Sequence, residues 1–254
     1  MMPDNDEFTK EELQTLLYLK KLKMPAMSNA LEKQFRDPNA NLRPFPERMF
    51  EIVSAEWDSR SDKRFQRNLK QATLRYPAAD IDETIHDPAR QLDADAIMRL
   101  NSCSWIDEGH NLLITGKSSS GKTYLCNALC ISALRKFKTV VYYKASRLID
   151  LMAKARLDRT YYQFVDKLLK MDLLVIDDFG LMPLDMDECR DMFGLIDERE
   201  AGKKSTAVVS QLPVKNWFDL FHDPTYADAI LTRLTDKSNS YRLEMNGRNM
   251  REPF

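Results

Sequence analysis

Hydrophobic residues recur at helical spacing over the first third of the chain. The apolar positions of the first stretch are Leu13, Leu16, Leu17, Leu19 and Leu22, a pattern typical of a helix. A second, longer helix is expected to begin after Pro44-Phe45-Pro46 and to run to about Arg75, because proline suits the start of a helix and not its interior. Residues 1–76 are therefore predicted to form a small all-α domain.

From residue 111 onward the pattern changes to short apolar runs separated by helical stretches. This alternation favours an α/β fold with a parallel sheet covered by helices on both faces. The predicted strands are residues 111–115, 139–143, 173–176, 206–210 and 241–245. Between the two regions, residues 77–110 contain prolines and several Asp, and we interpret them as a connector with one or two small helices. The remainder, 111–254, is the predicted main domain.

Composition and charge limit the classes of function. The 254 residues are 43% hydrophobic and 30% charged, an ordinary soluble mixture. The net charge is −1, so any contact with DNA must come from local basic patches. No apolar run approaches the roughly 20 residues of a membrane span. The acidic, polar start, Met1 to Glu7, is wrong for a signal peptide, so we expect a cytoplasmic protein without a membrane partner.

The cysteines and histidines give little support for a metal-centred hydrolase. Cys126 and Cys130 are one helical turn apart, but no second Cys or His pair has metal-binding spacing. We interpret both as buried thiols. The three histidines are scattered along the chain.

Residues 116–123 match the phosphate-loop pattern G-x-x-x-x-G-K-[ST]. A predicted strand precedes the loop and an apolar helix, from Tyr124 to Leu134, follows it, which argues against a loop that merely resembles the pattern. In such a loop the backbone amides and the helix N-terminus point at the nucleotide phosphates. Lys122 supplies a mobile positive charge, and the Thr123 hydroxyl can bind Mg²⁺. The predicted ATP-binding residues are Gly116, Lys117, Ser118, Ser119, Ser120, Gly121, Lys122, Thr123 and Tyr124.

An acidic pair follows the third predicted strand and supplies the second half of such a site. Asp177 stands at the carboxyl end of the strand, where it can hold Mg²⁺ through water. Asp178 can orient and deprotonate the attacking water as a general base. A solvated acidic turn is the alternative. Both motifs follow strand C-termini, where α/β sheets bind their ligands.

Several segments, together with these motifs, closely resemble the IstB family of insertion-sequence helper ATPases, which are related to DnaC-type helicase loaders. The similar segments are 22–27 (LKMPAM), 56–60 (EWDSR), 173–181 (LLVIDDFGL), 210–214 (SQLPV) and 223–234 (DPTYADAILTRL). The resemblance implies an AAA+ fold without a C-terminal helical lid and ATP-dependent self-assembly into a homo-oligomer. It also implies non-specific duplex DNA binding and assistance to a partner transposase in target selection and transposition.

The resemblance also implies roles for three further residues. Gln211 is similar to the family's sensor of the γ-phosphate, and Arg233 to the arginine finger that reaches the neighbouring subunit's nucleotide. Arg251 aligns with a C-terminal arginine that acts as a second sensor. The sequence departs from the family at Thr232, where Asp is usual, and this change is expected to weaken any ion pair holding the finger. Lys117 and Ser119 replace the usual Pro and Gly, which leaves the hydrolysis rate open.

Two basic stripes are candidate DNA contacts. The first, on the long N-terminal helix, contains Arg60, Lys63, Arg64, Arg67 and Lys70. The second follows the second predicted strand and contains Lys144, Arg147, Lys154, Arg156 and Arg159. In related initiator and loader ATPases, the second location carries a helical insertion that faces the nucleic acid. The alternative is a solvated helix face paired with local acids. Neither stripe has base-reading chemistry, so contacts would be made with the DNA backbone.

The leading hypothesis is therefore a helper ATPase for transposition that uses ATP and Mg²⁺. A DnaC-like helicase loader is the nearest alternative and would prefer single strands or a helicase. A metabolic kinase would need an acceptor pocket and an arginine-bearing lid, and the sequence shows neither. A scaffold that binds ATP without hydrolysing it is disfavoured by the acidic pair.

Overall fold

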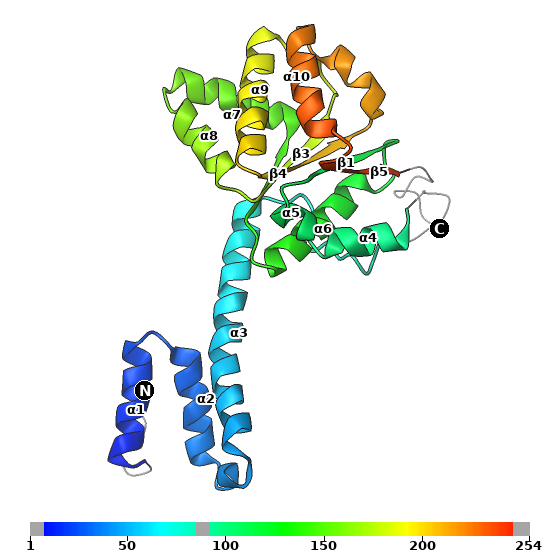
Figure 1. The fold of residues 1–254 in the computed structure, drawn as a ribbon. Helices are drawn as coiled ribbons and strands as arrows, with labels where there is room; N and C mark the ends of the chain where they lie inside the picture. Colours follow the sequence, from blue (N-terminus) through cyan, green and yellow to red (C-terminus); the bar gives the residue numbers. More distant parts are fainter. Residues whose placement is uncertain (1–7, 85–91, 246–254) are drawn as a thin grey trace. The chain divides into compact units, whose positions relative to one another are not determined.

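The computed structural model describes residues 8–84 and 92–245, and the chain divides into two compact units, Met1–Gln66 and Arg67–Phe254. The first unit is helical (Figure 1). Its elements are α1 (Lys10–Lys21), α2 (Pro25–Arg36), the short 3-10 helix η1 (Ala40–Leu42) and most of α3 (Phe45–Ala72). The helical character of this region was predicted, and α1 and α3 correspond to the two helices expected there, whereas α2 was not expected as a separate helix; α3 ends three residues before the expected Arg75.

Local chemistry explains where the first helices begin. Thr9 and Glu12 form a reciprocal capping box at the start of α1. Pro25 opens α2, and the Glu56 carboxylate of α3 accepts the amides of Ala26 and Met27 at 2.9 and 3.1 Å. Glu56 therefore replaces the side-chain cap that α2 itself lacks.

The second unit contains a five-stranded parallel sheet with the order β2-β3-β4-β1-β5. The strands are β1 (Asn111–Gly116), β2 (Val140–Lys144), β3 (Leu173–Phe179), β4 (Ser205–Ser210) and β5 (Ser240–Met245). They lie where the apolar runs predicted them, and the α/β prediction is confirmed. However, β3 continues past Ile176 to Phe179, with an irregularity in its pairing with β4. The acidic pair is therefore inside the strand's end and not beyond it.

Helices cover both faces of this sheet (Figure 1). On one face lie α4 (Ala94–Asn101), α5 (Ser104–Asp107) and α6 (Lys122–Arg135), and the first two are the small helices predicted in the connector. On the other face lie α7 (Ala145–Leu157), α8 (Tyr161–Leu169), α9 (Met186–Ala201) and α10 (Pro224–Thr235). The 3-10 helices η3 (Val214–Asn216) and η4 (Phe218–Leu220) precede α10. None of the helices in the described ranges is long and apolar enough to cross a membrane.

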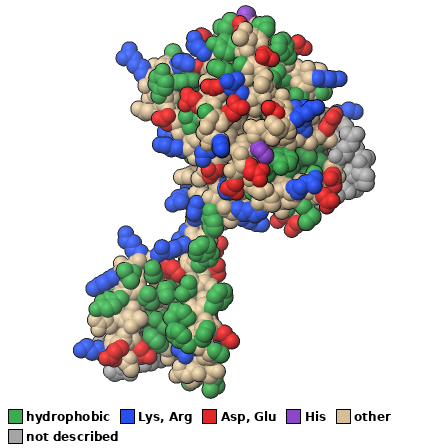
Figure 2. Space-filling view, in the orientation of Figure 1, with side chains coloured by type: hydrophobic (Ala, Val, Ile, Leu, Met, Phe, Trp, Pro, Cys, Tyr) green, Lys and Arg blue, Asp and Glu red, His purple; other side chains and the backbone are tan. Residues whose placement is uncertain are grey.

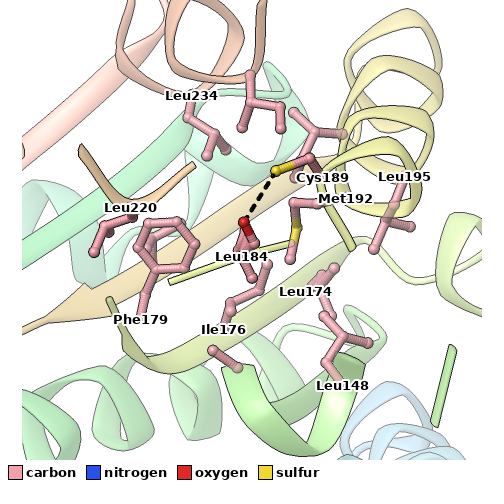
Figure 3. Close-up of a cluster of buried hydrophobic side chains, with 14 of the residues drawn as sticks. Leu148, Leu174, Ile176, Phe179, Leu184, Cys189, Met192, Leu195, Leu220 and Leu234 are labelled. Carbon is pink, nitrogen blue, oxygen red and sulfur yellow. Dashed lines mark hydrogen bonds between the residues drawn. The ribbon is translucent and has the colours of Figure 1, made fainter. Parts of the chain in front are cut away.

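An apolar cluster of buried side chains lies between the sheet and the second group of helices (Figure 3). Leu174 and Ile176 alternate along β3 so that both side chains reach this face, as the period of two in a strand requires. Each fully buried side chain of this size contributes about 1.5–3 kcal/mol. Cys126 and Cys130 are free and buried, which confirms the prediction of buried thiols.

Candidate nucleotide-binding site

The phosphate loop begins where β1 passes close to β5. Gly116 has φ 143°, and a Cβ at this position would lie 2.0 Å from the Met245 carbonyl oxygen, so only glycine fits. Ser119 and Gly121 also have positive φ, 62° and 88°. Gly121 makes no side-chain cap for α6, so the backbone amides at this helix N-terminus can bind an anion.

Lys122 is the buried cation of the loop. Its Nζ donates to the carbonyl oxygens of Gly116 and Lys117 at 2.7 and 2.6 Å. Burial lowers the pKa of its ammonium, and the negative charges of Asp177 and Asp178 oppose that shift. Lys122 therefore provides a positive charge inside the loop, close to both carboxylates.

Asp177 is buried and held by three donors. The Thr123 hydroxyl donates to Oδ2 at 3.0 Å, and the Tyr142 hydroxyl donates to the same oxygen at 2.5 Å. The backbone N–H of Asp178 donates to Oδ1 at 2.8 Å. Burial, together with the hydrogen bond to Asp177, raises the pKa of Tyr142 well above its ordinary value. Thr123 and Asp177, the two predicted metal ligands, are thus adjacent oxygen donors.

Asp178 follows in a strained backbone position. Its φ is 56°, which is uncommon for a residue with a side chain, and it lies at the irregularity of β3. This conformation turns the strand's end so that Asp178 lines the same cavity as Asp177. The Nζ of Lys144 forms an ion pair with its Oδ2 at 2.7 Å. Lys144, which the sequence grouped with the DNA contacts, therefore lies beside the proposed base.

Lys122, Thr123, Asp177 and Asp178 line one cavity of about 360 Å³. The Ser210 hydroxyl at the end of β4 donates to the Phe179 carbonyl at 2.7 Å and accepts the Leu212 amide at 3.0 Å. Those bonds join the ends of β4 and β3, and the intervening Gln211 lines the cavity. The parts predicted from separate motifs are thus brought together: the loop residues Ser118, Ser119, Gly121, Lys122, Thr123 and Tyr124, with Asp177, Asp178 and Gln211.

The sequence missed one wall of the cavity, formed by residues 75–84. The Tyr124 hydroxyl donates to Glu83 at 2.6 Å, and the rings of Tyr124 and Tyr76 lie 5.8 Å apart. Arg75 also lines the cavity, with its guanidinium 5.5 Å from the Tyr76 ring. An aromatic pair at the edge of a phosphate loop can pack against a nucleotide base. In the sequence, the aromatic Tyr76 before Pro77 was the one feature that could have indicated this wall. No spacing rule connects it with the phosphate loop.

Arg233 is placed elsewhere, on the last turn of α10, and its side chain is held by carboxylates of α9. Its Nη2 lies 2.6 Å from Oδ1 of Asp197, and its Nε lies 3.2 Å from Oε2 of Glu200. Thr232 was expected to weaken any ion pair that holds Arg233, and the structure shows that the acidic partners of Arg233 come from a different helix. Arg251 lies outside the described residues.

The candidate DNA contacts fall into two groups. Arg60 is engaged with Glu56 and the Lys23 carbonyl, both at 2.8 Å, and Arg156 pairs with buried Asp191. The remaining candidates are exposed, as Arg60 and Arg156 themselves are: Lys63, Arg64, Arg67, Lys70, Arg147, Lys154 and Arg159. On the face drawn in Figure 2, basic and acidic side chains are interspersed over the larger unit. Arg60 and Arg156 thus have structural partners of their own, in addition to the DNA role that the sequence suggested.

A parallel sheet with a phosphate loop after β1 and a buried aspartate at the end of β3 defines a P-loop nucleotide-binding protein. The chain belongs to the IstB-like ATP binding protein family, whose model matches residues 17–253. It is 37% identical to an insertion-sequence ATP-binding protein of Sinorhizobium fredii over 79% of this chain and 80% of the relative.

Solved structures share the fold, among them a helicase loader and a replication initiator. The DnaC helicase loader superposes with a TM-score of 0.59 at 19% identity, over 68% of this chain and 99% of the matched chain. The replication initiator DnaA, bound to AMPPCP and single-stranded DNA, gives a TM-score of 0.57 at 17% identity, over 68% of this chain and 51% of the matched chain. The AAA+ fold that the sequence resemblance implied is thereby confirmed.

Proposed function

We propose that the protein is an ATP-hydrolysing helper of DNA transposition, which assembles on duplex DNA with ATP and assists a transposase. One observation carries the proposal: the loop lysine, a buried aspartate and a second, strained aspartate converge on one cavity. Membership of a family of insertion-sequence ATP-binding proteins supports the transposition context.

ATP fits this cavity chemically. The amides of the loop and Lys122 provide positive charge for the phosphates, and the Tyr76–Tyr124 wall provides an apolar surface for the base. Thr123 and Asp177 are the hard oxygen donors that Mg²⁺ prefers, and they would hold it. When bound, the ion would neutralise phosphate charge.

In the hydrolysis step, Asp178 accepts the proton of the attacking water and Gln211 contacts the γ-phosphate or that water. Both side chains line the cavity. Lys144 is paired with Asp178, so the base has a cationic neighbour that orients it. Arg233 of a neighbouring subunit acts in trans and supplies positive charge to the transition state.

The test is to size the protein by light scattering on duplex and single-stranded DNA, each with ATP, ADP or no nucleotide. Large assemblies that need both ATP and duplex DNA are expected. A preference for single strands would favour the helicase-loader alternative, and indifference to DNA would overturn the proposal. Adding the element's transposase to the ATP-bound assembly, with DNA strand transfer as the readout, tests the partner.

A further inference from the structure

We infer that Asp197 and Glu200 of α9 are positioning residues for Arg233, holding its guanidinium ready to enter the nucleotide site of a second copy of this chain. The inference rests on the proposed function, in which Arg233 acts in trans. The three side chains lie in the larger unit, outside the lining of the cavity.

Three side chains on one face of α9 contact Arg233, and we call them the platform: Phe193, Asp197 and Glu200. Phe193, Asp197 and Glu200 are four and then three residues apart and so share one face of the helix. The Arg233 guanidinium lies 5.1 Å from the Phe193 ring, within the range of a cation–π contact. The platform therefore contacts the guanidinium through its ring face and through two carboxylates.

The backbone of Arg233 is fixed as well. The Asn111 side chain donates to the Arg233 carbonyl at 3.0 Å and accepts the Thr206 amide at 2.9 Å. These bonds tie the end of α10 to strands β1 and β4, which carry the phosphate loop and Gln211. Both the main chain and the side chain of Arg233 are thus held relative to the sheet.

The hydrogen bonds of Arg233 leave part of the guanidinium for another anion. Nε and Nη2 are directed to Asp197, and Nη1 donates to the Ala229 carbonyl at 2.8 Å. An arginine has five N–H groups. These bonds use three of the five, one on each nitrogen. One N–H therefore remains on each Nη atom, and the two together could donate to a phosphate.

Stability alone is a weak reason for this arrangement. The side chains of Arg233, Asp197 and Glu200 are 27%, 44% and 42% exposed, and ion pairs of such exposure contribute little to folding. A pre-ordered arginine has already given up its rotamer freedom before it meets the neighbouring nucleotide, so less is lost in the transition state. The acids therefore serve the function of Arg233 more than the fold.

The experiment compares ATP turnover of full-length protein assembled on duplex DNA. The clamp variant carries Asp197→Asn and Glu200→Gln, and Glu198→Gln is the control for removing a carboxylate from the same helix without touching Arg233. We expect the clamp variant to turn over about tenfold more slowly than wild type. Glu198→Gln is expected to match wild type.

Mixing variants separates a positioning role from a folding defect. The clamp variant mixed with Lys122→Ala protein is expected to regain turnover, because the second protein donates an intact Arg233 to an intact loop. The clamp variant mixed with Arg233→Ala protein is expected to stay slow, since neither subunit donates a well-positioned arginine.

Three outcomes overturn the inference: wild-type or faster turnover of the clamp variant, no recovery with Lys122→Ala protein, or recovery with Arg233→Ala protein. A reference mixture of Arg233→Ala and Lys122→Ala proteins tests the shared site itself. If that mixture also shows no recovery of turnover, the role of Arg233 in trans within the proposed function fails. If it recovers while the clamp variant behaves as wild type, only the inference fails.

Discussion

Two side chains of the cavity are expected to separate nucleotide binding from hydrolysis. Lys122 contributes charge where the loop amides converge, and Asp178 contributes a carboxylate at a strained position of β3. The first interaction exists as soon as ATP binds, whereas the second matters when a water molecule attacks. Variants of the two should therefore fail in different assays.

Lys122→Ala is expected to abolish most ATP affinity, because the phosphates lose the one buried ammonium of the loop. Fluorescence titration with a labelled ATP analogue measures the decrease. Lys215→Ala, at an exposed lysine outside the cavity, is the control for removal of a positive charge. Equal affinity of both variants would show that the loop is not the site.

Asp178→Asn is expected to bind ATP almost normally but to hydrolyse it at least about 10²-fold more slowly, since an amide cannot accept the proton of water. Single-turnover measurements of phosphate release decide this. The variant should remain assembled on DNA longer than wild type. Asp219→Asn, at an exposed aspartate, is the control. If both variants turn over ATP at the same rate, the assignment of Asp178 as the base is contradicted.

At the scale of elements, α7, α8 and their connecting turn hold basic residues of two kinds. Arg156 pairs with Asp191 of α9 and lies 3.9 Å from the Tyr161 ring, so it joins three helices. Lys154 and Arg159 are exposed, and Arg159 occupies a positive-φ position of 56° after the helix. The first kind supports the fold, and the second is the better candidate for DNA phosphates.

Lys154→Ala with Arg159→Ala is expected to weaken duplex binding equally on unrelated sequences and to leave the melting temperature unchanged. Each DNA phosphate that the variant no longer neutralises should flatten the slope of log affinity against log salt by roughly 0.9. Fluorescence anisotropy across a salt series measures both the affinity and the slope. Unaltered affinity would place the DNA surface elsewhere on the molecule.

Arg156→Ala is expected to act on stability, because buried Asp191 would be left without its partner. A buried polar group left without its partner costs about 1–3 kcal/mol, and a charged group costs more. Each kcal/mol lowers the melting temperature by about 2–4 °C in a protein of this size. Calorimetry provides the measurement, with Lys154→Ala as the control on the same helix. A melting temperature equal to that of the control would mean that the pair carries no structural role.

At the scale of the whole molecule, DNA binding is expected to need ATP and to depend steeply on salt. A chain of net charge −1 with few exposed cations in each stripe should bind weakly as a monomer. Assembly through ATP would link many weak sites and raise their effective concentration. Affinity measured from low to moderate salt, with and without ATP, tests this. Tight binding without nucleotide, or a strong preference for one sequence, would contradict it.

Those features of the protein that depend on residues close together in the chain could be predicted from its sequence. The phosphate loop, the acidic pair after the third strand and the five strands depend on short-range spacing, because glycine conformations, helix starts and strand periodicity are local properties. The irregularity that extends β3 to Phe179 was missed, because no local signal marks a strand that continues through two aspartates.

Only the tertiary structure decided which distant side chains meet. The order β2-β3-β4-β1-β5 brings Tyr142 and Lys144 of β2 against the acidic pair of β3. The packing of α9 against α10 brings Asp197 to Arg233, 36 residues away along the chain. Such contacts depend on strand order and helix packing, which no short stretch of sequence encodes. The sequence by itself therefore predicted the phosphate loop and the acidic pair, and the fold decided how Asp178 and Arg233 are held.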